Sequence, residues 1–247
     1  MPPVCWHMVT ARLAAKRLGS TLLSDAPGSY LLGATAPDVR IMTGQPREDT
    51  HYITLEADHP EDSIENLLAA NPHVTQLTGR PRAFVAGYFT HIEIDQAWIR
   101  EVYRPFFGRE STYHNTLQAH FMDRTLQFYM DWKERLDRDL VNAFYQDVVA
   151  PELVQEAALI PPETLSQWQG FVKQILHNEP SWDWFSDFLQ RRLKAETGVS
   201  EMDMRDLASN LPDVLETVLN YVTPARLAAF KEDAVRRQMA ALRSYLQ

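Results

Sequence analysis

His91 and Asp95 are the two residues whose spacing most directly predicts chemistry, because they lie four positions apart in a helical segment. Side chains at positions i and i+4 of a helix share one face. In a helical projection of residues 82–102, Arg82, Glu93 and Arg100 fall together as an exposed face, so the imidazole and the carboxylate point toward the buried side. Burying either group without a partner is costly. Two interpretations stay open: a core histidine hydrogen-bonded to its own aspartate, or two ligands of one cation.

Three other residues of ligand type precede this helix and favour the cation. His7 stands at the start of the first expected helix, Asp38 ends the sequence Gly-Ala-Thr-Ala-Pro-Asp, and His51 lies in a polar loop. Imidazole and carboxylate ligands suit Zn²⁺, and a set without thiolate is also compatible with Fe²⁺ or Mn²⁺. The chain therefore carries enough ligands for a metal centre if folding brings these side chains together.

The order of these motifs resembles that of the zinc-dependent phospholipase C family, which is related to the S1/P1-type nucleases. Members show an early His, a G-A-x-A-P-D-like loop, a T-H-F/Y-like His and a G-Y-x-T-H-x-x-x-D-like helix. The corresponding residues here lie between about 5 and 107, under half of the chain. The resemblance implies an all-α, multi-helix phospholipase C/P1-nuclease-like bundle with a metal site between helices and loops.

Carried over position by position, the resemblance implies two Zn²⁺ ions. Asp38, His51, His91 and Asp95 would bind one ion, while His7 and a bridging oxygen of Asp95 would serve the second. Two metals about 3.5–4 Å apart can generate a hydroxide at neutral pH and stabilise an in-line phosphoryl displacement. The implied function is a metal-dependent hydrolase of a phosphate ester through metal-bound hydroxide, with Asp38, His91 and Asp95 at the reaction centre. Its substrate would be a small-molecule or lipid-headgroup phosphoester.

The sequence departs from the family pattern at the second metal. Secreted members use their processed N-terminal amine as a ligand. Here Met1 lies six residues before His7 and no cleavable signal is recognisable, so that ligand is in doubt.

A second departure concerns a third metal, for which family members supply a His soon after the Asp of the helix. No histidine follows Asp95 until His114. His120 and Asp123, three positions apart on the next expected helix, could share a face and bind a further ion with His114. The alternative is that these are ordinary residues of a helix surface.

Two arginines near the expected ligands are candidates for substrate binding. Arg40 and Arg47 lie beside Asp38 and His51 and could hold a phosphate bidentately. Both could equally form ion pairs with loop residues Glu48, Asp49 or Asp58. Thr50 and Tyr88 are candidates for orienting the imidazoles from behind.

Composition narrows the class of protein. The net charge of −9 comes without a basic stripe, so we expect no duplex nucleic-acid binding. Cys5 is the only cysteine, which excludes an intrachain disulfide and any multi-cysteine zinc motif. No apolar run approaches the ~18 residues of a membrane-spanning helix. With no recognisable secretion signal either, we expect a cytoplasmic protein; the patterns predict no oligomeric state.

The elements that must position these residues are predicted to be helices. Helical periodicity is expected at residues 7–18, 22–32, 61–70, 82–102, 111–149, 165–175, 182–194, 214–222 and 225–245, and residues 51–56 are the one extended candidate. Six of the eight histidines precede residue 115. We therefore predict a metal-binding helical region at 1–150 and a C-terminal helical region at 151–247 packed on it, or one continuous domain.

Two other functions fit the same ligands. One is a different metalloenzyme chemistry, such as iron-dependent oxidation. The other is a helical interaction protein in which the metal is only structural.

Overall fold

The computed structural model describes residues 3–55, 57–108, 110–111, 117–150, 159–197 and 210–247. All regular secondary structure within these ranges is helical, and no strand occurs in them, so the predicted all-α fold is confirmed. In chain order the elements are α1 (Val4–Leu18), α2 (Thr21–Asp25), α3 (Pro27–Gly33), η1 (Ala36–Val39), α4 (Arg40–Thr43), α5 (Glu48–His51), η2 (Pro60–Asp62), α6 (Ser63–Ala70), η3 (Pro72–Gln76), α7 (Gly79–Trp98), η4 (Ile99–Phe107), α8 (Leu117–Arg135), α9 (Arg138–Val148), α10 (Pro162–His177), α11 (Trp182–Thr197), α13 (Leu211–Tyr221) and α14 (Pro224–Leu246).

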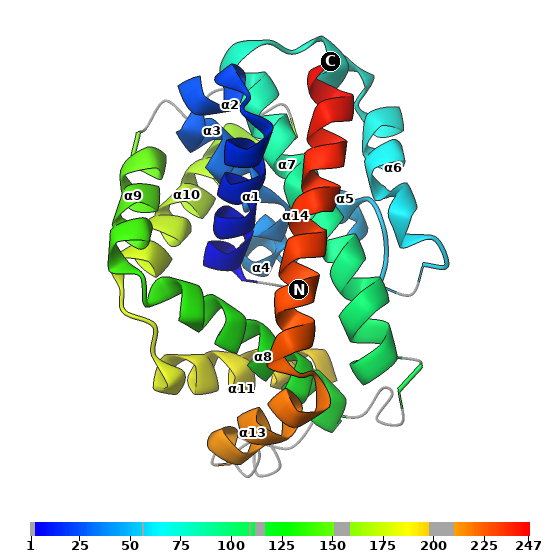
Figure 1. The fold of residues 1–247 in the computed structure, drawn as a ribbon, viewed down its shortest axis with the longest axis vertical. Coiled ribbons are helices and arrows are strands. Elements are labelled where there is room, and N and C mark those ends of the chain that lie inside the picture. The colour runs from blue at the N-terminus through cyan, green and yellow to red at the C-terminus, as the bar shows by residue number, and fades with distance from the viewer. Residues whose placement is uncertain (1–2, 56, 109, 112–116, 151–158, 198–209) are drawn as a thin grey trace.

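Helix α7 is the centre of the bundle. Helices α1, α3, α6 and α14 pack around it, and α14 runs alongside both α1 and α7 (Figure 1). From Ala83 to Trp98 every side chain of α7 is buried except that of Glu93, which is partly exposed. The face predicted to be exposed, which carries Arg82, Glu93 and Arg100, is thus the least buried side of a core helix.

A second group of helices closes the side of the bundle next to α1. Helix α8 packs against α1, α11 and α13, while α9 and α10 pack against each other, and α9 also contacts α3 (Figure 1). The first turn of α1 has no capping side chain of its own. Instead, the Asp131 carboxylate on α8 accepts a hydrogen bond of 3.0 Å from the Trp6 backbone N–H. A side chain remote in sequence therefore satisfies one of the free N–H groups at this helix end.

Two glycines allow α3 and α7 to approach at backbone distance. A Cβ at Gly87 would overlap the carbonyl oxygen of Tyr30 and lie 2.7 Å from the Ala34 backbone nitrogen. A Cβ at Gly33 would meet the backbone of Phe84 in the same way. This contact brings the loop that follows α3 against α7, one turn before His91.

Local signals explain several helix ends. Gly19 ends α1 in the left-handed conformation, with φ of 69°, as expected of a C-terminal glycine. Pro37 occupies the first turn of η1, where its missing N–H is not needed. The Thr223 side chain accepts a hydrogen bond from the Arg226 N–H at the start of α14.

Two expectations about secondary structure are wrong. Residues 51–55 do not form the expected extended segment, and residue 56 lies outside the described residues: His51 ends α5, and Tyr52 adopts a positive φ of 58°. The central helix does not end at residue 102, the expected boundary, but continues from Trp98 as the π-helix η4, which contains Pro105 and stops before Gly108. In a π-helix each N–H bonds to the carbonyl five residues earlier, whereas in an α-helix it bonds to the carbonyl four residues earlier. The missing N–H of Pro105 therefore removes a different hydrogen bond than it would in an α-helix.

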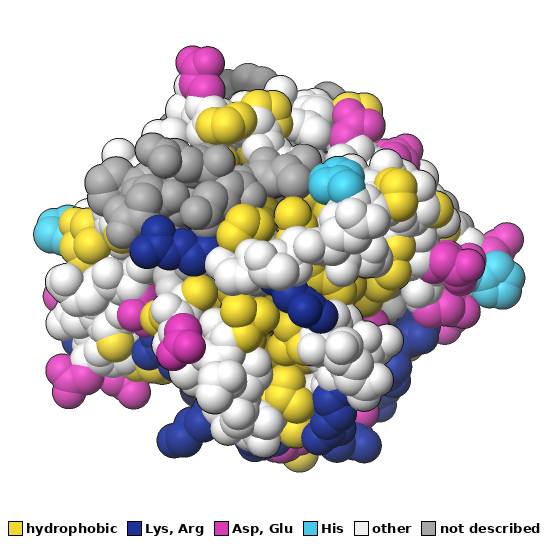
Figure 2. Space-filling view, turned by 90° about the horizontal axis from the view of Figure 1, so that it is seen from above, with side chains coloured by type: hydrophobic (Ala, Val, Ile, Leu, Met, Phe, Trp, Pro, Cys, Tyr) yellow, Lys and Arg dark blue, Asp and Glu magenta, His cyan; other side chains and the backbone are white. Residues whose placement is uncertain are grey.

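None of the helices in the ranges given above combines the length and apolar character that a membrane span needs. Figure 2 shows one face of the molecule, on which hydrophobic side chains lie open among Lys, Arg, Asp and Glu side chains.

Candidate metal centre

Five side chains predicted as ligands converge in the interior. His7 comes from α1, Asp38 from η1, His51 from α5, and His91 and Asp95 from α7. Each of these residues is at most 5% exposed. The cluster therefore lies where the central helix meets α1 and the loop region that follows α3.

His51, His91 and Asp95 form the tighter half of the cluster. The Nε2 atoms of His51 and His91 are 3.3 Å apart. Asp95 Oδ2 lies 3.0 Å from His51 Nε2 and 3.4 Å from His91 Nε2. Ligand atoms bound tetrahedrally to zinc at 2.0–2.1 Å are separated by about 3.3 Å, so these three atoms have the spacing of ligands around one ion.

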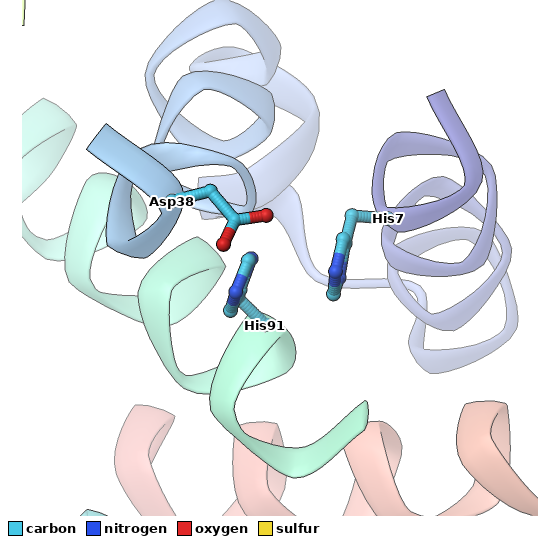
Figure 3. A group of neighbouring side chains, drawn as sticks. All are labelled: His7, Asp38 and His91. Atoms are coloured by element: carbon cyan, nitrogen blue, oxygen red, sulfur yellow. The ribbon is translucent and has the colours of Figure 1, made fainter. Parts of the chain in front are cut away.

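His7, Asp38 and His91 form the other half. The three side chains point toward one another from α1, η1 and α7 (Figure 3). The His7 and His91 rings are stacked, with centroids 3.9 Å apart and planes 10° from parallel. Asp95 Oδ1 lies 3.7 Å from His7 Nε2, whereas its Oδ2 faces His51 and His91. The two oxygens of Asp95 thus face the two halves, as a bridging ligand requires.

In His91 and His51, the Nδ1 atom, which points away from the other ligands, contacts a neighbouring polar group of the protein. His91 Nδ1 donates to the Ala34 carbonyl oxygen at 2.9 Å, which leaves its Nε2 as the ligand atom. His51 Nδ1 lies 2.9 Å from the Thr50 hydroxyl. Tyr88 in turn donates from its hydroxyl to the Thr50 carbonyl at 2.5 Å. Thr50 therefore contacts an imidazole as predicted, whereas the hydroxyl of Tyr88 contacts the backbone of Thr50 and not an imidazole.

Several polar atoms of the cluster have no hydrogen-bond partner among the described residues. They are both ring nitrogens of His7 and Asp95 Oδ1. Because His91 Nδ1 carries its proton toward Ala34, a neutral His91 also directs a lone pair at His51. Buried polar groups without partners are costly, and a cation between these atoms removes the cost.

Burial and neighbouring charges set the protonation of the cluster. Burial lowers the pKa values of His7 and His51, with the His91 charge adding to the effect on His7 and Arg47 to that on His51. Burial alone would raise the pKa of Asp95, but the His91 charge, hydrogen bonds from His51 and His91, and the Arg47 charge together hold that pKa well below its usual range. His7, His51 and Asp95 therefore have the protonation states that bind metals. The Asp95 charge raises the pKa of His91 despite its burial, so a metal ion would displace a proton from that imidazole.

Arg47 reaches the cluster directly. Its Nη2 donates to Asp95 Oδ2 at 3.0 Å, and both residues are buried. Arg40 and Arg47 also line a cavity of about 330 Å³, together with Glu48, Tyr103 and His120. The Arg47–Asp95 pair was not among the ion pairs that the sequence suggested, because nothing in the spacing of positions 47 and 95 indicates that the loop folds onto α7.

The residues considered for a third metal are not brought into the cluster. Both Asp123 oxygens accept hydrogen bonds, from Trp98 Nε1 at 3.1 Å and Gln127 Nε2 at 2.7 Å. In the described part of the chain, two groups of side chains have ligand atoms close enough together to hold a metal ion, and neither group contains His120 or Asp123. The third candidate, His114, lies outside the described residues.

No protein-family model, characterised protein or solved structure matches the chain.

Proposed function

We propose that this cluster binds two metal ions, Zn²⁺ before Fe²⁺ or Mn²⁺, and that the protein is a metal-dependent phosphoester hydrolase resembling the zinc-dependent phospholipases C. The observation that carries the proposal is the unpartnered, fully buried set of His7 nitrogens and Asp95 Oδ1. A structural histidine–aspartate pair would satisfy its own polar atoms. Here His7 Nε2 and Asp95 Oδ1 instead face each other at 3.7 Å, which is too long for a hydrogen bond.

The residues fit two ions. Asp95 Oδ2, His51 Nε2 and His91 Nε2 would hold one ion, with Asp38 near the same point at 3.7 Å from His51 Nε2. His7 and Asp95 Oδ1 would hold the other. Since both far nitrogens of His51 and His91 are anchored, little rearrangement is needed for binding.

The balance of charge favours an anionic substrate. The centre contains two carboxylates, Asp38 and Asp95, and one guanidinium, Arg47. Two dications would reverse its net charge from −1 to +3. Such a site attracts a phosphate group. The guanidinium groups of Arg40 and Arg47, which line the adjoining cavity, are suited to donate hydrogen bonds to the phosphate oxygens.

The reaction would be hydrolysis of one P–O bond. When bound, the metals would supply a water of lowered pKa and neutralise charge on phosphorus. Arg47 and Arg40 would bind non-bridging phosphate oxygens and orient the ester. A new P–O bond forms to the water oxygen as the bond to the alcohol oxygen breaks, and the alcohol leaves with a proton.

Elemental analysis of purified wild type and His91→Ala tests the metal, with His59→Ala as control because the His59 side chain is 72% exposed. We expect a stoichiometric transition metal in wild type and the control but a reduced content in His91→Ala. Metal-loaded wild type should then hydrolyse members of a panel of phosphate mono- and diesters. A wild type that takes up no stoichiometric metal under any loading condition overturns the proposal.

The same preparations separate the two rival functions. Oxygen consumption by the iron-loaded protein, without phosphate release from any ester, would indicate oxidative chemistry. A lowered melting temperature of His91→Ala, with no reaction detected in metal-loaded wild type, would indicate a structural metal.

A further inference from the structure

A second cavity, of about 130 Å³, lies beside the candidate metal centre. Residues of α8, α10 and α11 form most of it, and Val4 at the start of α1 closes one side. Asp38 lines this cavity and also belongs to the metal-type cluster with His7 and His91. A molecule held at the centre through its phosphate could therefore extend into this space.

The cavity walls are mainly apolar. Val4, Phe128, Phe185 and Leu189 are buried, and the Phe128 and Phe185 rings are stacked with centroids 4.1 Å apart. Further apolar lining comes from Phe171, Ile175, Trp184 and Phe188. Trp184, stacked on Phe188, is 45% exposed.

The polar side chains of the lining that come from α8 already have protein partners. Gln127 donates to Asp123, and Arg124 donates to Gln127 Oε1 at 3.2 Å. Asp131 accepts from the Trp6 N–H, and Arg135 donates to the carbonyls of Ile175 and Asn178. These groups do not require a polar ligand, so the space favours an apolar one.

Its volume limits the size of that ligand. Engineered cavities of about 150 Å³ lined by Leu, Ile and Phe bind benzene. A cavity of about 130 Å³ is therefore matched to a single six-membered ring and is far too small for two acyl chains.

We propose that this cavity, hereafter the ring pocket, binds the apolar part of the substrate, and that the substrate is a phosphoester carrying one compact, benzene-sized group. The assignment of the ring pocket to a substrate rests on the proposed phosphoester hydrolase. Its preference for an apolar ring rests on the walls alone and can be tested without any metal.

The kinetic test compares benzyl phosphate with methyl phosphate. Both release a primary alcohol of similar acidity, so the difference between their kcat/KM values reports contact with the ring. We expect kcat/KM for benzyl phosphate to be about 10–100-fold higher in metal-loaded wild type, within the range set by small apolar groups in a pocket. Vesicles of a diacyl phospholipid should be poorer substrates than benzyl phosphate.

Filling the ring pocket should remove this preference. Ile175→Trp enlarges a partly buried lining residue, and Gln174→Trp, at the exposed neighbouring position of α10, is the matched control. The first variant should bring the ratio of kcat/KM for benzyl phosphate to kcat/KM for methyl phosphate close to 1, and the control should keep the wild-type ratio. Ile175→Phe, a smaller change, should give an intermediate loss of the preference for benzyl phosphate. It provides the same test if the Trp variant does not fold.

A binding measurement separates this proposal from the proposed function. Fluorobenzene binding is followed by ¹⁹F NMR in chelator-treated protein, where no hydrolysis takes place. Binding that is lost in Ile175→Trp and retained in Gln174→Trp supports the ring pocket, even if no phosphoester is cleaved and the hydrolase proposal fails. Absence of fluorobenzene binding, equal kcat/KM for the two phosphates, or a preference for the diacyl vesicles overturns it.

Discussion

Replacing Gly87 by alanine should destabilise the protein, although alanine is the better helix former. The added methyl would overlap the Tyr30 carbonyl oxygen and lie 2.7 Å from the Ala34 nitrogen, whereas ordinary van der Waals contacts of a Cβ begin at 3.4 Å. The Ala34 contact alone requires a shift of 0.7 Å, and the closer Tyr30 oxygen requires more, so α3 and the residue after it must move away from α7 by more than 0.7 Å. Overpacking of this kind costs ~1–3 kcal/mol.

The same shift pulls Ala34 from His91, whose hydrogen bond to the Ala34 carbonyl contributes about 1 kcal/mol. The better helix propensity of alanine returns about 1 kcal/mol, so the net expected loss is ~1–3 kcal/mol. Because that hydrogen bond also orients a metal ligand, the metal affinity should fall by about 10–100-fold.

Gly170→Ala in α10 is the matched control. A Cβ at Gly170 would meet nothing within 4 Å, so propensity alone should act and stabilise the protein by ~0.5–1 kcal/mol. Urea unfolding of both variants in chelator, followed by far-ultraviolet circular dichroism, gives the two changes. A Gly87→Ala protein as stable as wild type would refute the close approach of α3 and α7.

Three other predictions test the structure. Burial raises the pKa of Asp131 to about 6 from an ordinary 3.8, so its favourable contribution to stability below pH 4 is lost as pH rises through 6. Asp131→Asn keeps an acceptor for Trp6, and its stability relative to wild type in urea unfolding should therefore increase by up to ~3 kcal/mol between pH 4 and pH 7.5; an unchanged difference would contradict this. Thr50→Val removes the hydroxyl beside His51 Nδ1 and should weaken Zn²⁺ binding about 10–100-fold in a chelator competition, whereas the exposed Thr75→Val should not. Zn²⁺ added to stripped protein at about 100 times its Kd should raise the unfolding free energy by ~2.7 kcal/mol, and no rise would argue against a site formed only in the folded state.

Helices with strong local signals could be predicted from the sequence. The C-terminal helix expected at 225–245 is α14, Pro224–Leu246, and the helix expected at 165–175 is α10, Pro162–His177. In both helices the signals lie within the segment itself: a proline in the first turn marks the start, and an amphipathic repeat marks the helix. Such signals need no knowledge of the tertiary structure.

The candidate ligands were also predictable, but their surroundings were not. Helical spacing places His91 and Asp95 on the buried side of their helix, where such residues are unusual, and the resemblance to the zinc-dependent phospholipase C family adds the remaining three, His7, Asp38 and His51. The Arg47–Asp95 pair and the Asp131 cap on α1 join positions far apart in the chain. No local pattern records such contacts.

The π-helix after Trp98 is a backbone conformation that the local sequence also does not predict. Proline usually interrupts a helix, and the helix expected at 82–102 ends shortly before Pro105. The segment continues to Phe107 because tertiary packing buries Ile99, Val102, Tyr103 and Phe107. Burial of these side chains outweighs the local preference.

The packing of α14 has a consequence for the order of events during synthesis. Gln238, fully buried on α14, donates to the Thr90 carbonyl on α7 and approaches Thr10 on α1. The backbone next to His91 and the helix that carries His7 are thus joined by a residue that is synthesised more than a hundred positions later. A nascent chain that still lacks α14 on the ribosome should hold its histidines in an unassembled state, so cation capture should be among the last steps of maturation.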